Sequence, residues 1–426
     1  MTRVDTIVIG AGHAGLAVSR LLTEAGREHV VLDRGRVAER WRSERWDSLH
    51  LLSPNWMTRL PGWWYGGADP DGYMSGARFT HFLERYAASF DAPVVGGTAV
   101  RELSAAADGY RVDTDNGGWH ARQVVIATGP HGTPVVPAGL DRLADVEVVT
   151  ANRYRNPDRL AAGGVLVVGA SASALQIADE LVRAGREVTL AAGRHTRMPR
   201  RYRGMDSFWW LHTTGRQART IDQMPDPDAA RREPSLQLVG RNDPGRHGAD
   251  LDLGTLRVRG VRLTGRVLGV DGGTVLRLAD DLGENVAVAE QQLHGFLDTV
   301  DHHIACNRLS GEVWAPDRPR PVEVPATPTS LDLRAEGIGT VLVAAGYRPH
   351  HPWLRLPVTG PDGHIRQHRG VTAASGVYVV GQRFQHRRDS ATIDGARHDA
   401  RAVVGHLLAR CEDDRELQSS GEESAA

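Results

Sequence analysis

The sequence of 426 residues contains no lysine, so all 51 of its basic side chains are arginines. This absence excludes catalysis by a lysine amine, including Schiff-base chemistry. Only two cysteines are present, Cys306 and Cys411, and neither belongs to a Cys-x-x-Cys motif. We therefore predict no redox-active disulfide, and we expect both cysteines to pack as small apolar residues.

Long apolar runs are also missing, because no stretch of about 18 apolar residues occurs. The first apolar run follows Met1 so closely that no room is left for a signal peptide. The formal net charge of −1 gives no general electrostatic reason to bind nucleic acid or an anionic membrane. The pairs His302-His303 and His350-His351 do not predict a metal site, because adjacent side chains do not share a face. We expect a cytoplasmic protein without metal, nucleic-acid or membrane partners.

The strongest positive signal is a glycine-rich turn in the segment DTIVIGAGHAGLAVSRLL near the start of the chain. An apolar run predicts a strand before the turn, and a helical pattern follows it. Gly10, Gly12 and Gly15 occupy the three positions of a dinucleotide-binding fingerprint, where a helix N-terminus favours an anionic pyrophosphate. The next apolar run ends in Asp33, whose carboxylate can accept hydrogen bonds from an adenosine ribose. Arg34 follows directly and is a candidate for the same site.

A second turn of this kind lies in the segment GVLVVGASASALQIADEL. Gly169, Ser171 and Ala174 stand at its three fingerprint positions, so only the first is glycine. Serine still allows close approach of a phosphate and can donate a hydroxyl, and Ser173 is a further candidate. Two such turns indicate two dinucleotides, which is typical of a flavoprotein that is served by a nicotinamide cofactor.

The strand after the second turn ends without an acidic residue, in a segment that contains Arg194 and Arg197. Guanidinium groups bind a 2′-phosphate through charge-assisted hydrogen bonds, so this segment favours NADPH over NADH. The alternative that both are ordinary solvated arginines stays open, because the whole chain is rich in arginine.

Several motifs, in their order along the chain, carry a family resemblance. They are GAGHAG, the ATG of Ala127, Thr128 and Gly129, the second glycine-type turn, and a late GVYVVG…DG element. Together they resemble the flavin-containing monooxygenases, the class B flavoprotein monooxygenases, most strongly over 1–200 and 335–410. The resemblance implies an α/β fold with two Rossmann-like dinucleotide-binding domains, of which the NADPH domain is inserted into a split FAD domain.

Domain boundaries follow from this resemblance. We predict residues 1–157 as the first part of the FAD-binding domain and 331–412 as its second part. Residues 158–330 are predicted to form the NADPH-binding domain with a helical insertion. Residues 413–426 are polar and acidic, and we predict a disordered tail there.

The resemblance also implies which residues lie near the flavin, on either side of the cleft and along the ribityl chain. They are Trp41, Arg45, Asp47, Ser48, Thr128, Gly129, Gly381, Gln382 and the pair Asp394-Gly395.

Four positions bear on oxygen chemistry. Thr150 stands where related sequences often have histidine, and Leu52 aligns with an asparagine of animal members that helps to protect the flavin hydroperoxide. Asn55, three residues further on, could supply an amide in its place, and we name it as the candidate catalytic residue. Gln382 replaces an aspartate that many FAD enzymes have. Oxygen transfer is therefore implied less firmly than flavin binding.

The function implied is a monooxygenase in which NADPH reduces FAD, O2 adds at flavin C4a, and the hydroperoxide transfers an oxygen atom to a small organic substrate. Two alternatives remain open: an NADPH-dependent flavin oxidase or reductase without substrate oxygenation, and a non-catalytic NADP-sensing flavoprotein. Segment 206–325 contains no motif that identifies the substrate. The sequence also leaves open whether the protein forms a homodimer.

Overall fold

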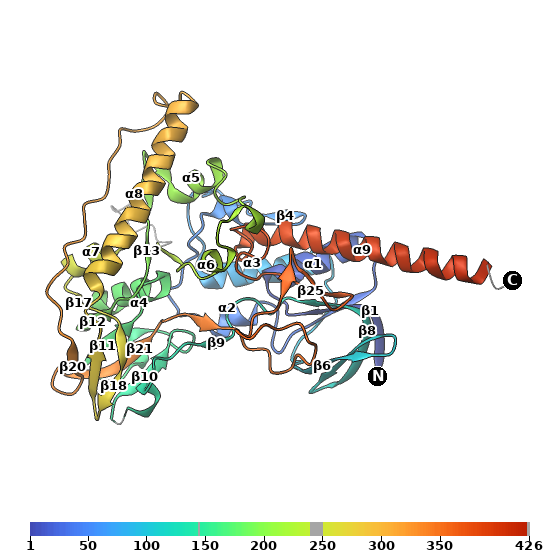
Figure 1. The fold of residues 1–426 in the computed structure, drawn as a ribbon, viewed down its shortest axis with the longest axis horizontal. Coiled ribbons are helices and arrows are strands. Elements are labelled where there is room, and N and C mark those ends of the chain that lie inside the picture. Colours follow the sequence, from blue (N-terminus) through green and yellow to red (C-terminus); the bar gives the residue numbers. More distant parts are fainter. Residues whose placement is uncertain (144, 239–249, 424–426) are drawn as a thin grey trace.

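The computed structural model describes residues 1–143, 145–238 and 250–423. Two bodies make up the fold, each built around a sheet with helices packed against it (Figure 1). The bodies lie side by side, and the long helix α9 (Ile393–Glu423) extends away from the first of them.

The first body contains a nine-stranded sheet that combines strands from both ends of the chain. In spatial order, its central parallel strands are β5 (Val94–Val95), β2 (His29–Leu32), β1 (Thr2–Ile9), β8 (Gly117–Ile126) and β25 (Val377–Val379). Four further strands are antiparallel. Strand β7 (Gly109–Thr114) pairs with β8, and β6 (Val100–Ala106) pairs with β7. Strands β24 (Val371–Thr372) and β23 (Gln367–His368) follow β25 at the edge of the sheet.

Helices cover one face of this sheet. They are α1 (His13–Glu24), α3 (Gly76–Ala88) and α9, and they enclose an apolar core that includes Leu16, Phe79 and Val403. The other face packs against residues of β6 and β7. Because both faces are covered, the central strands are apolar at consecutive positions, as the sequence shows.

The second body has a five-stranded parallel sheet in the order β10 (Glu147–Thr150), β21 (Ile338–Val343), β11 (Gly164–Val168), β12 (Val188–Ala191) and β17 (Arg262–Thr264). One face packs against α4 (Ala172–Arg183) and α7 (Leu253–Val258), and the other against the small sheet of β18 (Val267–Gly272), β19 (Val275–Leu278) and β20 (Ser330–Asp332). Val165 and Val167 face the helices, whereas Leu166 and Val168 face the small sheet.

A helical insertion joins the two bodies. It consists of α5 (Ser207–Thr213), α6 (Pro227–Arg231) and α8 (Leu282–Cys306), and its core residues Trp210 and Phe296 share a cluster with Met57 of the first body. The short elements of the chain are α2 (Glu39–Ser43), β3 (Arg59–Leu60), β4 (Trp63–Trp64), β13 (Thr196–Arg197), β14 (Arg201–Tyr202), β15 (Met205–Asp206), β16 (Leu236–Gln237), and the 3-10 turns Asn55–Met57, Leu140–Arg142, Pro157–Arg159 and Ile221–Gln223.

The chain crosses between the bodies twice, and the two crossings pair with each other. They are β9 (Thr133–Pro134) and β22 (Tyr347–Arg348), which form an antiparallel pair. The predicted boundaries at 157 and 331 are therefore wrong by one strand each, because β10 and β21 belong to the inserted sheet. Both are short apolar runs, and such a run does not by itself indicate which of two similar sheets it joins.

The predicted disordered tail is wrong for 413–423, because α9 continues to Glu423; residues 424–426 lie outside the described residues. The segment CEDDRELQ contains four acidic residues and one arginine, and Arg415 stands three positions after Glu412, a spacing that favours a helix. Among the described residues, no helix combines the length and the apolar character that crossing a membrane requires.

Candidate functional site

The first glycine turn lies at the carboxyl end of β1 and leads into α1. Gly10 has a φ of +114°, and a Cβ there would lie 2.7 Å from the carbonyl oxygen of Ala127. A Cβ on Gly15 would lie 1.9 Å from the carbonyl oxygen of Gly10. Both glycines are therefore required by the packing of the turn itself.

Gly12 differs, because a Cβ there would meet no atom of the described residues within 4 Å. Gly12 is the N-cap of α1, and within the described chain no side chain caps the free N–H groups of this helix end. The open space next to unpaired N–H donors fits a pyrophosphate.

Asp33 follows β2 and lies beside this turn. Its Oδ2 accepts a hydrogen bond from the backbone N–H of Ala11 at 2.7 Å, and its Oδ1 accepts one from Gly35 at 2.8 Å. These bonds fix the carboxylate, while each oxygen keeps a second lone pair for a ribose hydroxyl.

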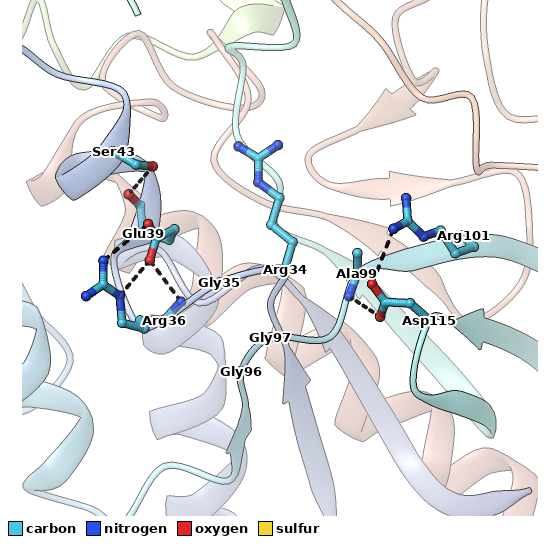
Figure 2. A pocket seen from close by; sticks show the side chains of 10 residues that line it. All are labelled: Arg34, Gly35, Arg36, Glu39, Ser43, Gly96, Gly97, Ala99, Arg101 and Asp115. Atoms are coloured by element: carbon cyan, nitrogen blue, oxygen red, sulfur yellow. Dashed lines mark hydrogen bonds and ion pairs between the residues drawn. The ribbon is translucent and has the colours of Figure 1, made fainter. Parts of the chain in front are cut away.

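A cleft of about 700 Å³ opens at Arg34 and Gly35, the two residues that follow Asp33 in the chain (Figure 2). The cleft is lined by Arg34, Gly35, Arg36, Glu39, Ser43, Gly96, Gly97, Ala99, Arg101 and Asp115. Arg34 extends from the centre of this group and forms an ion pair with Glu44. The size and position of the cleft fit an adenosine whose ribose reaches Asp33.

The residues expected on the flavin side of the cleft form two groups. The guanidinium of Arg45 lies 5.3 Å from the ring centre of Trp41, and burial lowers its pKa. Asp47 instead contacts the segment between β10 and β11 of the second body, since its Oδ2 accepts a hydrogen bond from Asn156 at 2.6 Å. Ser48 accepts a hydrogen bond from His50 through its backbone carbonyl.

Two buried polar atoms beside the first turn have no hydrogen-bond partner among the described residues. They are Oγ1 of Thr128 and Nε2 of His13, and burial lowers the pKa of His13 to about 4. Burial also lowers the pKa of His131 to about 3, and the charges of Arg45 and Arg40 add to that shift. Unpaired buried polar groups are costly, so this region fits a polar, anionic cofactor.

The late turn follows β25 and lies at the same edge of the sheet as the first turn, because β25, β8 and β1 are parallel. Gly381 has a φ of +75°, and a Cβ there would lie 3.0 Å from Cβ of Ala14. The amide of Gln382 donates to the carbonyl of Gly129 at 3.4 Å. Gly381 therefore adjoins the start of α1, and Gln382 adjoins the Ala127-Thr128-Gly129 segment.

Asp394 is buried at the start of α9, and arginines surround its carboxylate. Arg59 donates two hydrogen bonds to it, at 2.7 and 2.8 Å, and Arg397 donates one at 2.9 Å. Burial opposes ionisation, but these hydrogen bonds outweigh it and lower the pKa of Asp394. The structure gives Asp394 a structural ion-pair role, and cofactor contact by this residue stays a prediction.

The second turn repeats the geometry of the first. Gly169 has a φ of +129°, and a Cβ there would lie 2.5 Å from the carbonyl oxygen of Ala344. Ser171 is the N-cap of α4, and in the described chain its hydroxyl caps no backbone N–H. Ser173 lies in the first helical turn, and Ala174 is fully buried. Two hydroxyls beside free N–H donors fit a second pyrophosphate.

The two arginines predicted at the 2′-phosphate lie in different environments. Arg194 is exposed and makes no hydrogen bond or ion pair with any residue that the structure describes. Arg197 is buried, and it donates to Asp252 at 2.8 Å, to Glu290 at 3.2 Å and to the carbonyl of Arg320 at 2.7 Å. The prediction for Arg197 is therefore corrected, because its charge is already balanced by two carboxylates.

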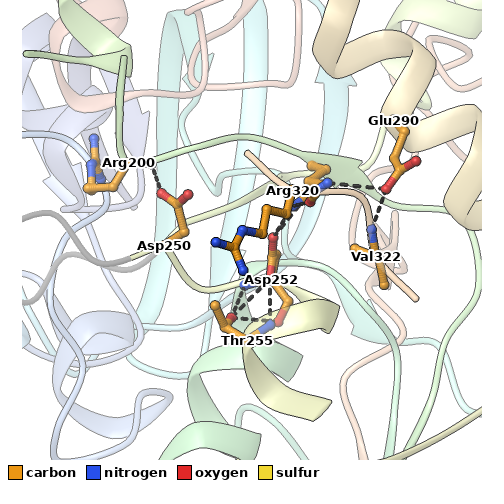
Figure 3. Close-up of polar contacts among 8 residues, drawn as sticks. Arg200, Asp250, Asp252, Thr255, Glu290, Arg320 and Val322 are labelled. Atoms are coloured by element: carbon orange, nitrogen blue, oxygen red, sulfur yellow. Dashed lines mark hydrogen bonds and ion pairs between the residues drawn. The ribbon is translucent and has the colours of Figure 1, made fainter. Parts of the chain in front are cut away.

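Figure 3 shows the surroundings of this ion pair. Asp252 lies with Thr255 at the start of α7, and Glu290 of α8 accepts a hydrogen bond from the N–H of Val322 at 2.6 Å. Close by, Asp250 accepts a hydrogen bond from the N–H of Arg200 at 2.6 Å, and burial raises the pKa of Asp250 to about 6. These contacts hold the insertion against the second body.

Asn55 is buried in the loop that follows α2. Its Nδ2 donates to the carbonyl of Asp69 at 2.9 Å, while its Oδ1 has no partner among the described residues. The hydroxyl of Thr150 donates to Asn152 at 2.6 Å, and Leu52 accepts a hydrogen bond from Arg200 through its carbonyl. An amide role for Asn55 stays a prediction.

One residue beside the second turn has no signal in the sequence. Gln237 is fully buried, its Nε2 donates to the carbonyl of Ala170 at 2.6 Å, and its Oε1 has no partner in the described part of the chain. Gln237 lies 67 positions from the residue that it contacts, so no local pattern could identify it. Across the described residues, no group of three or more His, Cys, Asp and Glu side chains is arranged to hold a metal ion.

Comparisons with known proteins agree with this geometry. Residues 7–205 match the family model of the pyridine nucleotide-disulphide oxidoreductases. An uncharacterised CzcO-like oxidoreductase of Geobacillus kaustophilus is 29% identical over 95% of this chain and 98% of its own length. The indole-3-pyruvate monooxygenase YUCCA4 of Oryza sativa is 26% identical over 96% of this chain and 88% of its own.

Solved structures show the same fold. A flavin-containing monooxygenase from Stenotrophomonas maltophilia superposes with a TM-score of 0.66 at 20% identity, over 96% of this chain and all of its own. The thioredoxin reductase of T. acidophilum gives a TM-score of 0.54 at 15% identity, over 96% of this chain and 99% of its own. The predicted fold class and the resemblance stated from the sequence are confirmed.

Proposed function

We propose that this chain is a flavin monooxygenase-like oxidoreductase that uses FAD and NADPH and transfers one oxygen atom of O2 to a small organic substrate. One observation carries the proposal: two helix N-caps, Gly12 and Ser171, have the same backbone conformation and no side chain that caps them in the described chain. Two anion sites of this kind in one chain support a flavin nucleotide and a nicotinamide nucleotide that work together.

Residues of the first body hold FAD in this proposal. The N–H groups of α1 beside Gly12 bind the pyrophosphate, Asp33 binds the ribose, and the cleft beside Arg34 takes the adenine. Arg45 balances negative charge, and Thr128 contributes its unpaired hydroxyl. A bound flavin would supply the redox chemistry, as acceptor of a hydride from NADPH and donor of electrons to O2.

Residues of the second body hold NADPH. Ser171 and Ser173 donate hydroxyl hydrogen bonds to its pyrophosphate beside the N–H groups of α4, and Arg194 binds the 2′-phosphate. Gln237 fixes the carbonyl of Ala170, and with it the conformation of the turn.

Asn55 keeps one amide N–H and its Oδ1 for the reacting region, since only one N–H is used by Asp69.

A second candidate function is an NADPH oxidase that releases hydrogen peroxide. Thr150 favours it, because its hydroxyl is already used by Asn152 and cannot replace the donor that related enzymes have there. Fewer donors give less protection to reduced oxygen species, so peroxide formation would compete with oxygen transfer.

The two candidates differ in their products. The experiment measures NADPH oxidised, peroxide released and product formed under isotopically labelled O2, with a panel of amines, sulfides, indoles and ketones. We expect at least one compound to accelerate NADPH oxidation and to gain one labelled oxygen atom. Peroxide in stoichiometric yield with every compound would contradict oxygen transfer and favour the oxidase.

A further inference from the structure

Arg216 lies in the loop after α5, near Glu233, and forms no ion pair with any residue that the structure describes. Its guanidinium carbon lies 5.6 Å from the ring centre of Phe296, which is buried on α8. Within the described residues, Arg216 forms no hydrogen bond and no ion pair. Burial lowers the pKa of Arg216, and the neighbouring charge of Arg388 lowers it further. Partial removal of a charge from water is unfavourable unless another charge compensates it.

The neighbours of Arg216 increase this excess of positive charge. Glu233 forms an ion pair with Arg388, so the carboxylate and that guanidinium balance each other. Among the described residues, the guanidinium of Arg383 donates only to the backbone carbonyl of Glu233, and burial lowers the pKa of Arg383 too. Of three guanidinium groups beside one carboxylate, two have no negative partner in the part of the chain that the structure describes.

This cluster adjoins the turn that faces the flavin in the proposed function. The N–H of Arg388 donates to the carbonyl of Arg219 at 3.0 Å, and the N–H of Ile221 donates to the carbonyl of His386 at 2.7 Å. These bonds fix the segment that carries Arg216 against the segment that continues from Gln382. Arg383 is the residue directly after Gln382, so the cluster lies next to the proposed reacting region.

Apolar side chains complete the surroundings. Phe296 belongs to a core cluster with Met57 and Leu211, and Leu52 and Trp56 are half-buried against it. A cation above an aromatic ring at the edge of an apolar cluster suits a ligand with an anionic group and an apolar body.

We propose that Arg216, together with Arg383, binds the carboxylate of a small apolar acid and that this acid is the substrate. The proposal rests on the proposed function for the identity of the reaction. A phosphate of NADPH is the competing anion, but the second turn and Arg194 already offer donors for the phosphates of that cofactor. A planar carboxylate matches the fork of a guanidinium.

The test measures ligand binding to the oxidised, FAD-loaded protein, without turnover. The probes are phenylacetate, hexanoate and the neutral phenylacetamide, followed by changes in the visible flavin spectrum and by calorimetry. The variants are Arg216→Gln and Arg216→Lys, with Arg232→Gln as the control, because Arg232 is an exposed arginine of the same insertion. The affinity for NADP⁺ is measured in parallel.

We expect the wild type to bind both carboxylates and to bind phenylacetamide much more weakly. Arg216→Gln should weaken carboxylate binding by about tenfold to a hundredfold, the effect of one charge-assisted hydrogen bond or ion pair. Arg216→Lys should lose less, and Arg232→Gln should match the wild type. The affinity for NADP⁺ and the Tm of the ligand-free Arg216→Gln protein should not fall, because no described residue loses an ion pair.

Three results would overturn the proposal. One is equal binding of phenylacetate and phenylacetamide, or no binding of either carboxylate, by the wild type. Another is an Arg216→Gln protein with weaker NADP⁺ binding and unchanged carboxylate binding, which would assign the arginine to the cofactor. The third is a lowered Tm with unchanged carboxylate affinity, which would make the role structural. Because no turnover is measured, a failure to oxygenate substrates would not change these results.

Discussion

The two dinucleotide turns have nearly the same backbone but reach it with different residues. At the second fingerprint position, Gly12 has φ and ψ of −82° and −178°, and Ser171 has −93° and −177°. Any residue can adopt these angles, so the backbone does not require glycine there. Glycine at this position therefore leaves space for the ligand. The serine of the second turn fills part of that space with a hydroxyl group that can donate a hydrogen bond.

The first fingerprint position is governed by a different constraint. Gly10 and Gly169 both have positive φ, and each would place a Cβ against a backbone carbonyl of the neighbouring strand end. No side chain fits at either position, so both turns keep glycine.

The third position distinguishes the two turns by packing. A Cβ on Gly15 would lie 1.9 Å from a carbonyl oxygen, whereas Ala174 is accommodated with full burial. Helix α1 therefore lies closer to its turn than α4 does, by enough to exclude a methyl group.

The largest expected effect is at the second position. Gly12→Val should fill the open space beside the α1 N-terminus and remove all bound FAD, with the secondary structure unchanged. The matched variant Ser171→Val should keep FAD and weaken NADPH. Flavin absorbance of the purified proteins and circular dichroism check both variants. Full flavin content in Gly12→Val would contradict the assignment of the first turn.

The next largest effects are expected at Arg194 and Arg197, the two arginines that follow the second turn. Arg197→Ala should lower the free energy of unfolding by about 3–5 kcal/mol, because Asp252 and Glu290 lose their buried cation. Arg194→Ala should leave stability unchanged and weaken NADPH by about tenfold to a hundredfold, with little effect on NADH. Urea unfolding and coenzyme titrations measure these effects. An unchanged preference for NADPH in Arg194→Ala would place the phosphate site elsewhere.

A smaller effect is expected at the third position. Gly15→Ala forces a methyl group against a carbonyl and should cost about 1–3 kcal/mol of unfolding free energy, with reduced flavin content. Ala174→Gly removes a methyl group and should cost about 1 kcal/mol through helix propensity and lost packing. Urea unfolding of both proteins tests the difference. Equal losses would show that the two helices approach their turns equally.

The sequence predicts these turns well because their constraints are local: strand, turn and helix follow one another within about 20 residues. The same reasoning fails for Arg197, whose carboxylate partners are 55 and 93 positions away. Gln237 is missed for the same reason. The boundaries fail because β10 and β21 are apolar runs that either sheet could have taken, and only the pairing in space decides between them.

The smallest expected effect concerns Asn55, which lies three residues after Leu52, the position where related sequences have an asparagine. Its amide links its own loop to Asp69, and its Oδ1 is buried without a partner in the described chain. Asn55→Ala should remove about 1 kcal/mol of stabilisation from the reacting region, which is roughly a fivefold change, and raise the peroxide released per NADPH. The control Asn307→Ala changes an exposed amide after α8, which donates to the carbonyl of His303 at 2.8 Å, and it should leave peroxide release unchanged. Peroxide assays during NADPH oxidation test this prediction. Equal peroxide yields from Asn55→Ala and the wild type would show that Asn55 has no role in the reacting region.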